Sequence, residues 1–301
     1  MFVADRSDRN TLTPDTALAK LTAACEQVSV DSTGAELLRM GSNAVFRLPD
    51  RVVARVARDG SERVRTGVEV ARWLESEGFP AVRALPVEQP VLVGGTPVTF
   101  WVSVSEEDEY ATVVEVAEIV RDLHKLSQPA TLELPELDPF IRGAQHIESA
   151  PAVTDGDRAF LREWLSSLRE RYDQASFELP TGVVHGDASI GNVVHDRDGR
   201  PVLIDLDGFA VGPREWDLVL TALYYERFGW HSTEEYEAFV RTYGYDVRSS
   251  PAYEMLCDLR ELLMVTWLAQ KSGESQRTAR EVSKRVHALR AGGSRKDWSP
   301  Y

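Results

Sequence analysis

Two neighbouring stretches decide the fold class of this chain: VVHGDASIGNVV at residues 183–194 and PVLIDLDGFAVGPREWDL at residues 201–218. They place Asp187, Asn192 and Asp205 in a fixed order and at short spacing. Phosphoryl transfer requires a carboxylate that can lie beside an acceptor hydroxyl, and amide or carboxylate oxygens that suit a hard divalent cation. The pattern therefore predicts magnesium-dependent phosphoryl transfer, with Asp187 as the catalytic residue and Asn192 and Asp205 as magnesium ligands.

The composition limits the class of protein before any other motif is considered. A chain of 301 residues with 43% hydrophobic content can bury a sizeable core and usually divides into two lobes. No segment approaches the roughly 20 apolar residues of a membrane span, and the first residues, MFVADRSDRNTL, lack the apolar core of a secretory signal. We therefore expect a cytoplasmic protein without a membrane partner. Cys25 and Cys257 have no Cys or His at metal-ligand spacing and are expected to be buried apolar residues.

The charge of the chain bears on its partners. A formal net charge of −14 argues against a nucleic-acid surface, where clustered Lys and Arg would be expected. Acidity suits a cationic small molecule, but an acidic surface also simply keeps a protein in solution. The charge therefore excludes one class of partner and leaves the small-molecule acceptor open. It also leaves open whether the protein is a monomer or a homodimer.

The N-terminal third of the chain alternates short apolar runs with tight turns. The turns Gly41-Ser42-Asn43 and Pro49-Asp50 separate three runs that read as an antiparallel meander. A helix follows, and Gly94-Gly95 then separates two further apolar runs that read as a second hairpin. The predicted elements are strands at 36–40, 44–48 and 52–58, a helix at about 62–77 with Val64, Val68, Ala71 and Leu74 on one face, and strands within 84–93 and 98–104.

The rest of the chain is dominated by helical periodicity, which begins at Thr112. We therefore predict an N-terminal lobe at residues 1–105, of which 1–33 form a helical extension, and a larger C-terminal lobe at residues 106–301. The predicted elements of this second lobe are a helix after Thr112, a crossing loop with one short helix at 129–151, a helix at 155–174, strands at 182–184, 192–195 and 202–206, and helices over most of 214–291.

Four segments occur in the order that they have in the aminoglycoside phosphotransferase family: GSNAVFRL, VVARV, HGDASIGN and IDLDGF. HGD alone would also fit an ordinary turn, but several independent matches coincide here. The chain resembles that family over residues 36–218. The resemblance implies an α+β, bilobal, protein-kinase-like fold, with an antiparallel sheet and one helix in the N-terminal lobe and a mainly helical C-terminal lobe. It also implies a small-molecule kinase that uses Mg2+ and ATP or GTP.

The resemblance also implies residues that bind the nucleotide. Gly41, Ser42 and Asn43 would form the turn over the phosphates, although such turns mostly just connect strands. Arg55 stands where many kinases have Lys, and its planar fork can still bind two phosphate oxygens. Glu69 on the following helix would orient Arg55, unless both are solvated surface residues. The adenine base would lie beside the linking strand, at Phe100, Val102 and Val104.

Further residues are expected around the catalytic loop. His185 would support the loop, and Asp207 would be a nearby acid or an occasional metal ligand. By resemblance, His124 packs behind the loop and Asp217 anchors it. The residues expected to contact the acceptor are Tyr225, Glu226, Glu254, Asp258 and Glu261, although a solvated helix face explains these acidic residues equally well.

The resemblance leaves the acceptor hydroxyl open. The leading hypothesis is an antibiotic resistance or self-resistance enzyme that acts on an aminoglycoside or another natural product. Its closest alternative is a metabolic kinase for choline, homoserine, a hexosamine or a similar molecule, because the same fold serves all of these. A nucleotide-binding regulator that has lost catalysis is the alternative from another class, and the joint presence of Asp187, Asn192 and Asp205 argues against it.

Overall fold

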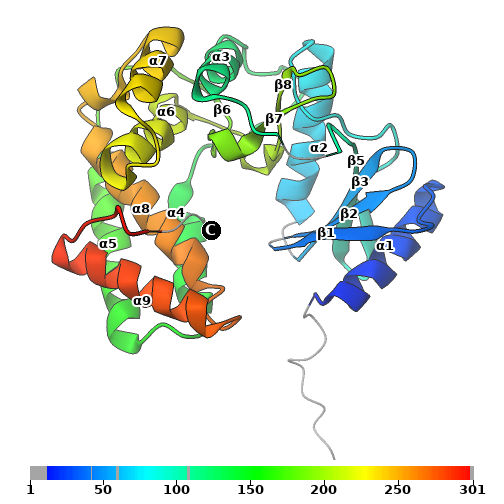
Figure 1. Ribbon diagram of the computed structural model, residues 1–301, viewed down its shortest axis with the longest axis horizontal. Helices are drawn as coiled ribbons and strands as arrows, with labels where there is room; N and C mark the ends of the chain where they lie inside the picture. The colour runs from blue at the N-terminus through cyan, green and yellow to red at the C-terminus, as the bar shows by residue number, and fades with distance from the viewer. Residues whose placement is uncertain (1–11, 42, 59–60, 107–108, 299–301) are drawn as a thin grey trace, which may run out of the picture. The chain divides into compact units, whose positions relative to one another are not determined.

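The computed structural model of the chain describes residues 12–41, 43–58, 61–106 and 109–298. The chain folds into two compact units (Figure 1). The first contains Met1–Ala111, Pro129–Leu134 and Gly191–Phe209, and the second contains Thr112–Gln128, Pro135–Ile190 and Ala210–Tyr301. The division into lobes at 1–105 and 106–301 stays a prediction.

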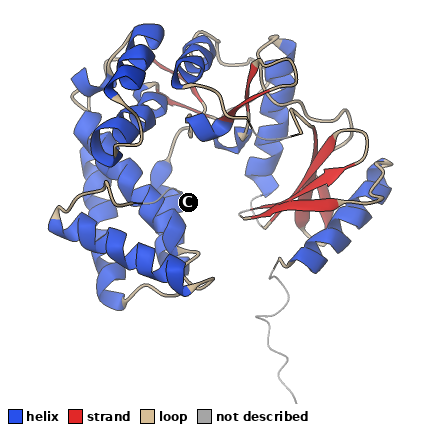
Figure 2. Ribbon diagram, viewed as in Figure 1, coloured by secondary structure: helices blue, strands red, loops and turns tan. Residues whose placement is uncertain are grey.

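A five-stranded antiparallel sheet with the strand order β1-β2-β3-β5-β4 forms the centre of the first unit. Figure 2 draws the strands in red. Both the meander and the second hairpin that the sequence predicts are confirmed. The first strand of that hairpin is shorter than predicted, because Pro86 and Pro90 interrupt the apolar run and proline cannot donate to a sheet. The strands are β1 (Glu36–Met40), β2 (Asn43–Leu48), β3 (Val52–Ala57), β4 (Val91–Val93) and β5 (Thr96–Val102).

Two helices belong to the first unit. Helix α1 (Pro14–Val28) begins with a capping box at Thr13, and its buried residues Leu21 and Ala24 share a core with Phe46 and Phe100 of the sheet. Helix α2 (Ser61–Ser76) buries the face that the sequence predicts, at Val64, Val68, Ala71 and Leu74. The helix expected within residues 1–33 is thus present as α1.

A short hairpin of β7 (Val193–His195) and β8 (Pro201–Leu203) also belongs to the first unit. Leu203 in β8 donates a hydrogen bond to the carbonyl of Pro80 and accepts one from the amide of Val82. On the other side of the hairpin, the amide of Ala111 donates to the carbonyl of Val193. These backbone bonds fix the hairpin to the segments that follow α2 and β5. The strand predicted at 202–206 ends early, because Leu206–Gly208 wind into the single turn η2.

The second unit is mainly helical, and α8 lies at its centre with buried residues all round. Strand β9 was not predicted from the sequence; it is a run of only four residues that includes Gly and Pro and pairs with β6. Of the helices that the structure describes, none is long and apolar enough to cross a membrane. The elements are α3 (Val113–Leu123), α4 (Pro139–Ser149), α5 (Asp155–Asp173), β6 (Thr181–Val184), β9 (Ala210–Pro213), α6 (Glu215–Leu223), the π-helical turn η3 (Tyr224–Phe228), α7 (Thr233–Tyr243), η4 (Val247–Ser249), α8 (Tyr253–Ala269) and α9 (Gln276–Ala291).

Candidate active site

The loop after β6 carries the HGD motif, and Asp217 holds it in place. Asp217 lies in the first turn of α6, where its two carboxylate oxygens accept the backbone N–H groups of His185 and Gly186, at 2.7 and 2.9 Å. Gly186 has a φ of 88°, which favours glycine at this position. Asp217 therefore anchors the loop, as predicted from its position in REWDL.

Asp217 is fully buried, and His124 forms a hydrogen bond with it from behind the loop. Nε2 of His124 lies 3.2 Å from Oδ2 of Asp217, and Nδ1 of His124 lies 2.8 Å from the hydroxyl of Tyr243. Burial alone would raise the pKa of Asp217, but the hydrogen bond with His124, the two neighbouring histidines and the amide of His185 hold that pKa below its usual value. His124 thus lies behind the loop, and Asp217 is held as a carboxylate.

The side chain of Asp187 is 61% exposed, although the backbone around it is fixed. Its Oδ1 lies 3.6 Å from a guanidinium nitrogen of Arg260, which is buried. His185 is fully buried, and its Nδ1 accepts the backbone N–H of Asp187 at 3.2 Å. Burial and the charge of Asp187 raise the pKa of Tyr224 to about 12, so this phenol stays protonated at neutral pH. The second unit therefore presents an accessible carboxylate on a rigid loop.

Asn192 and Asp205 belong to the first unit, at one end of the β7–β8 hairpin. Asn192 directly precedes β7, and Asp205 follows β8 by two positions, so antiparallel pairing brings the two residues to the same end. The amide of Ile204 donates to the carbonyl of Asn192 at 2.9 Å and continues this pairing. Asp205 has left-handed backbone angles, φ 60° and ψ 59°, which Asp tolerates better than most residues. The two predicted magnesium ligands are thus neighbours.

This pair of oxygen donors fits magnesium better than zinc. Among the residues that the structure describes, no group of three or more His, Cys, Asp or Glu is arranged to hold a metal ion. Magnesium commonly takes only one or two protein oxygens and completes its shell with phosphate and water. Asn192 and Asp205 therefore suit a magnesium ion that is held jointly with a nucleotide.

Arg55 lies in β3 and is 16% exposed at its side chain. Its guanidinium lies 3.4 Å from Oδ1 of Asp205 and stacks over the ring of Trp101, 5.5 Å from the ring centroid. The structure thus brings together two predicted site residues, Arg55 and Asp205, that are 150 positions apart in the sequence.

Glu69 does not pair with Arg55 in the described part of the chain. At about 3.6 residues per turn, Glu69 points to the side of α2 opposite to buried Gly67. It is exposed and lines a surface hollow of about 510 Å³ together with Arg72 and Trp73. The predicted Arg55–Glu69 contact is therefore absent, because helical geometry turns Glu69 away from the core side of α2.

Asp207 contacts the side of α2 that Glu69 was expected to occupy. A Cβ atom on Gly67 would lie 2.4 Å from Oδ1 of Asp207, so only glycine leaves room for this carboxylate. Nε of Arg63, one helical turn earlier, donates to the carbonyl of Asp207 at 3.2 Å. Gly67 and Arg63 therefore dock the segment that carries Asp205 and Asp207 against α2.

The predicted phosphate turn lies between β1 and β2. The amide of Gly41 donates to the carbonyl of Asn43 at 3.0 Å and closes the turn, whereas Ser42 lies outside the described residues. A Cβ atom on Gly41 would meet no atom within 4 Å. The turn is therefore open to its surroundings at Gly41.

The three positions predicted beside the adenine base differ in their surroundings. Phe100 is fully buried, and its amide donates to the side-chain oxygen of Gln89 at 2.7 Å. The amide of Val102 donates to the carbonyl of Arg83 at 2.9 Å. Val104, by contrast, makes no backbone hydrogen bond with any residue that the structure describes. Of these three positions, Val104 has the backbone groups best able to bond to a base edge.

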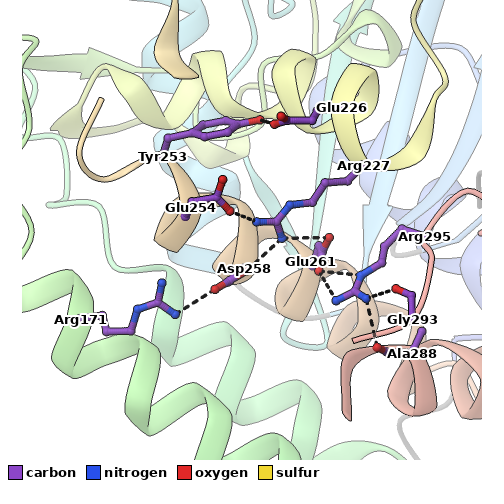
Figure 3. Close-up of polar contacts among 10 residues, drawn as sticks. All are labelled: Arg171, Glu226, Arg227, Tyr253, Glu254, Asp258, Glu261, Ala288, Gly293 and Arg295. Carbon is purple, nitrogen blue, oxygen red and sulfur yellow. Dashed lines mark hydrogen bonds and ion pairs between the residues drawn. The ribbon is translucent and has the colours of Figure 1, made fainter. Parts of the chain in front are cut away.

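The carboxylates predicted to contact the acceptor lie on α8 and η3, and the three on α8 are engaged with arginines (Figure 3). Arg227 contacts Glu254 at 2.6 Å, Asp258 at 2.9 Å and Glu261 at 3.2 Å. Arg171 and Arg295 form further ion pairs with this group, at 2.9 Å to Asp258 and 3.0 Å to Glu261, and Glu226 accepts from the hydroxyl of Tyr253. Tyr225 stacks on Tyr236 with ring centroids 4.9 Å apart. These five residues therefore already have partners, and their role at an acceptor stays a prediction.

Two residues beside the candidate site, Arg260 and Gly67, were not predicted from the sequence. Arg260 stands in the apolar run MLCDLRELLMV, and a cation in such a run usually has a buried partner. That signal could have identified Arg260, although not its partner. Gly67 carries no comparable signal, because its contact with Asp207 joins segments 140 positions apart.

Comparisons with known proteins identify the family and the fold class of the chain. Residues 35–256 match the model of the phosphotransferase enzyme family (APH). A segment of 71 residues is 43% identical to a probable ketoamine kinase of Lactiplantibacillus plantarum, and this segment is 24% of the present chain and 24% of that protein. The chain thus matches only about a quarter of the length of that relative.

Two solved structures are similar over nearly their whole length. The amicoumacin kinase hAmiN, solved with AMP-PNP, Ca2+ and Ami, has a TM-score of 0.69 and 12% identity, with 95% of this chain and 98% of that chain covered. An aminoglycoside-3′-phosphotransferase of type VIII has a TM-score of 0.61 and 21% identity, with 83% and 98% covered. At these identities the comparisons show the fold, and they confirm the predicted α+β, protein-kinase-like class. Because the family model spans residues 35–256, about three quarters of the chain, the chain belongs to the phosphotransferase enzyme family.

Proposed function

We propose that the protein is a magnesium-dependent O-phosphotransferase that moves the γ-phosphoryl group of ATP or GTP to a hydroxyl of a natural product, with an antibiotic such as an aminoglycoside as the leading acceptor. The observation that carries this proposal is the exposed carboxylate of Asp187 on a loop that is held in place. Its carboxylate is exposed, its loop is held by Asp217, and buried Arg260 lies beside it. A rigid loop with an accessible carboxylate suits a base that must meet a hydroxyl in one orientation.

Asp187 would accept the proton of the acceptor hydroxyl. The hydroxyl oxygen forms a bond to the γ-phosphorus, the bond from that phosphorus to the β–γ bridging oxygen breaks, and the nucleoside diphosphate leaves with the electron pair. The exposure of Asp187 supports this role, since a fully buried carboxylate could not contact an acceptor. The relative that was solved with AMP-PNP supports a nucleoside triphosphate as donor.

The first unit would bind the donor. Arg55 would turn from Asp205 toward the phosphates, where its fork can bind two oxygens. Gly41 and Asn43 would approach the phosphates through their backbone, and the backbone of Val104 would bond to the base edge. Asn192 and Asp205 would hold magnesium, which neutralises charge on the phosphate oxygens when it is bound.

The aromatic side chains after α6 support an acceptor that contains a ring. Tyr224 and Trp230 are both half-buried, with ring centroids 4.9 Å apart, and the pKa of Tyr224 responds to the charge of Asp187. Aromatic faces with a polar edge suit a sugar ring, which offers flat C–H faces and hydroxyl groups. An aminated sugar would meet this surface and the exposed part of Glu254, whose side chain is 72% exposed.

One observation favours a metabolic acceptor instead. The probable ketoamine kinase is 43% identical over its matched segment, a higher identity than either of the two solved structures shows. A ketoamine, or another small amine such as choline, homoserine or a hexosamine, is therefore the second candidate acceptor.

A coupled assay of nucleoside diphosphate release tests the proposal. ATP and GTP would be offered with magnesium against aminoglycosides, peptide and nucleoside antibiotics, ketoamines, choline, homoserine and hexosamines. We expect turnover with one antibiotic class, abolished in Asp187→Asn and retained in the matched control Asp198→Asn, whose side chain is 71% exposed. Turnover restricted to a metabolite would establish the second candidate. Nucleotide binding without transfer to any acceptor would favour a regulator.

A further inference from the structure

We propose that Arg260 is a positioning residue that acts on phosphoryl transfer through Asp187. The inference rests on the proposed role of Asp187 and extends it to a residue of α8, 73 positions further along the chain. It follows from how the guanidinium group is held, from how much of each partner is buried, and from what the pair would lose if either charge were removed.

The guanidinium of Arg260 is fixed by contacts that do not involve Asp187. One nitrogen, Nη2, donates to the carbonyl of Gly186 at 3.0 Å and to the carbonyl of Trp216 at 2.9 Å. The guanidinium carbon lies 3.8 Å from the centroid of the Trp216 ring, in a cation–π contact. Trp216 in turn donates from its indole nitrogen to the same carbonyl of Gly186 at 2.8 Å. Arg260 and Trp216 together therefore clamp the loop at the residue before Asp187.

The second nitrogen, Nη1, is directed at the carboxylate of Asp187, 3.6 Å from Oδ1. The side chain of Arg260 is only 7% exposed, whereas that of Asp187 is 61% exposed. A fixed, buried cation therefore stands behind a carboxylate that reaches into solvent. This contact restricts the rotation of the carboxylate, and a misplacement of about 1 Å in a catalytic group can cost roughly 10²-fold in rate.

Arg260 positions Asp187, and because Arg260 is buried, Asp187 in turn balances its charge. Burial lowers the pKa of Arg260, and the electrostatic interactions of Arg260 with Asp187, Asp217 and Tyr224 oppose that change. Asp217 is already committed to two backbone amides and to His124. Within the described residues, Asp187 is the one carboxylate that forms an ion pair with Arg260. Removing Asp187 would leave this buried cation without its ion-pair partner, so Asp187 should stabilise the fold as well as react.

The first experiment measures thermal unfolding of four proteins: wild type, Asp187→Asn, Arg260→Gln and the double variant. It needs no acceptor. We expect Asp187→Asn to lower the melting temperature by roughly 2–4 °C when Arg260 is present, and by less than half of that in the Arg260→Gln background. An equal shift in both backgrounds would show that the two charges do not interact and would overturn the proposal.

The second experiment measures turnover once an acceptor is known. We expect Arg260→Gln to lower kcat by roughly 10–100-fold with the KM of the nucleotide unchanged, and to add little in the Asp187→Asn background. Arg260→Lys keeps the positive charge, so its kcat should fall less than that of Arg260→Gln. Its kcat should still fall, because a lysine cannot contact two carbonyls and a carboxylate at once. Arg260→Lys also replaces Arg260→Gln as the test variant if Arg260→Gln fails to fold. Equal losses in the Lys and Gln variants, or an unchanged kcat in either, would overturn the inference, whereas full activity of Asp187→Asn would overturn the proposed function instead.

Discussion

Asp217 shows how one buried carboxylate fixes a whole loop. It accepts two backbone amides of the HGD loop and a hydrogen bond from His124. In Asp217→Asn, an NH2 group replaces one carboxylate oxygen. This NH2 group would face a backbone N–H group, from which it cannot accept a hydrogen bond. We therefore expect this variant to lower the free energy of unfolding by about 2–4 kcal/mol at pH 7, measured by urea denaturation.

The lowered pKa of Asp217 gives this prediction a pH dependence. The folded state releases the proton more readily than the unfolded chain, in which an aspartate has a pKa of about 3.9. The stabilisation is therefore complete above that value, and it is lost as the pH falls from there through the lower pKa of the folded state. The difference between wild type and Asp217→Asn should be constant from neutral pH to about pH 5 and shrink below about pH 4. A difference that grows on acidification would show that Asp217 is not held as a carboxylate. Asp198→Asn, at an exposed site, should match wild type throughout.

At the scale of elements, Arg227 joins η3 to α8, and Glu261 joins α8 to the segment after α9 (Figure 3). The side chain of Glu261 is only 1% exposed, and Arg227 and Arg295 balance its charge from two sides. Arg227→Met would leave Glu261 with Arg295 alone. We expect the free energy of unfolding to fall by about 3 kcal/mol, measured by urea denaturation.

Two further variants separate charge from packing in this cluster. Arg227→Met with Glu261→Gln removes two charges and keeps a side-chain oxygen that can accept from Arg295, so it should recover part of the lost stability. Arg241→Met removes an arginine that is 67% exposed and paired with Glu237, so it should change the free energy of unfolding by less than about 0.5 kcal/mol. If the double variant is as unstable as Arg227→Met, lost packing and not charge explains the effect.

The elements also show which parts of the structure local sequence patterns can predict. The three strands of the meander and the buried face of α2 follow from alternation and helical spacing, and both are confirmed. Strand β9 could not be predicted, because four residues with Gly and Pro show no alternation and are held by pairing with β6. Helix α4 runs over 11 residues where the sequence indicated mostly loop, since Asp138 caps it and Pro139 suits its first turn.

The residues of the candidate site also divide into those that the sequence predicts and those that depend on long-range contacts. Asp187, Asn192 and Asp205 were predicted from their order, and their roles stay predictions. The anchoring contact of Asp217, which the family resemblance implies, is present in the structure. The partner of Arg55, Asp205, could not be predicted. It depends on which side of α2 faces inward and on a contact between residues 150 positions apart. The clamp by Arg260 could not be predicted either, since it joins α8 to the loop after β6.

At the scale of the whole molecule, contacts between distant stretches of chain decide which residues share a unit. The first unit gathers three separate stretches of chain, and Gly191–Phe209 bring Asn192 and Asp205 to it. A single boundary read along the sequence assigns each residue by its position, whereas these units are defined by contacts, so the predicted division at residue 105 stays a prediction. The charge of the chain, by contrast, is known from the sequence in full.

That charge gives a prediction about both substrates. A protein with a formal net charge of −14 repels an anionic nucleotide and attracts a cationic acceptor, and salt screens both effects over a Debye length of about 30 Å at 0.01 M and about 10 Å at 0.1 M. As KCl is raised over that range at constant free magnesium, kcat/KM for the nucleotide should rise severalfold. For a polycationic aminoglycoside kcat/KM should fall, and for a neutral acceptor it should stay nearly constant. The opposite slopes are the control for general salt effects, because inhibition of the enzyme by salt would lower both values together. A nucleotide kcat/KM that falls with salt would show that local cations such as Arg55 outweigh the charge of the whole protein.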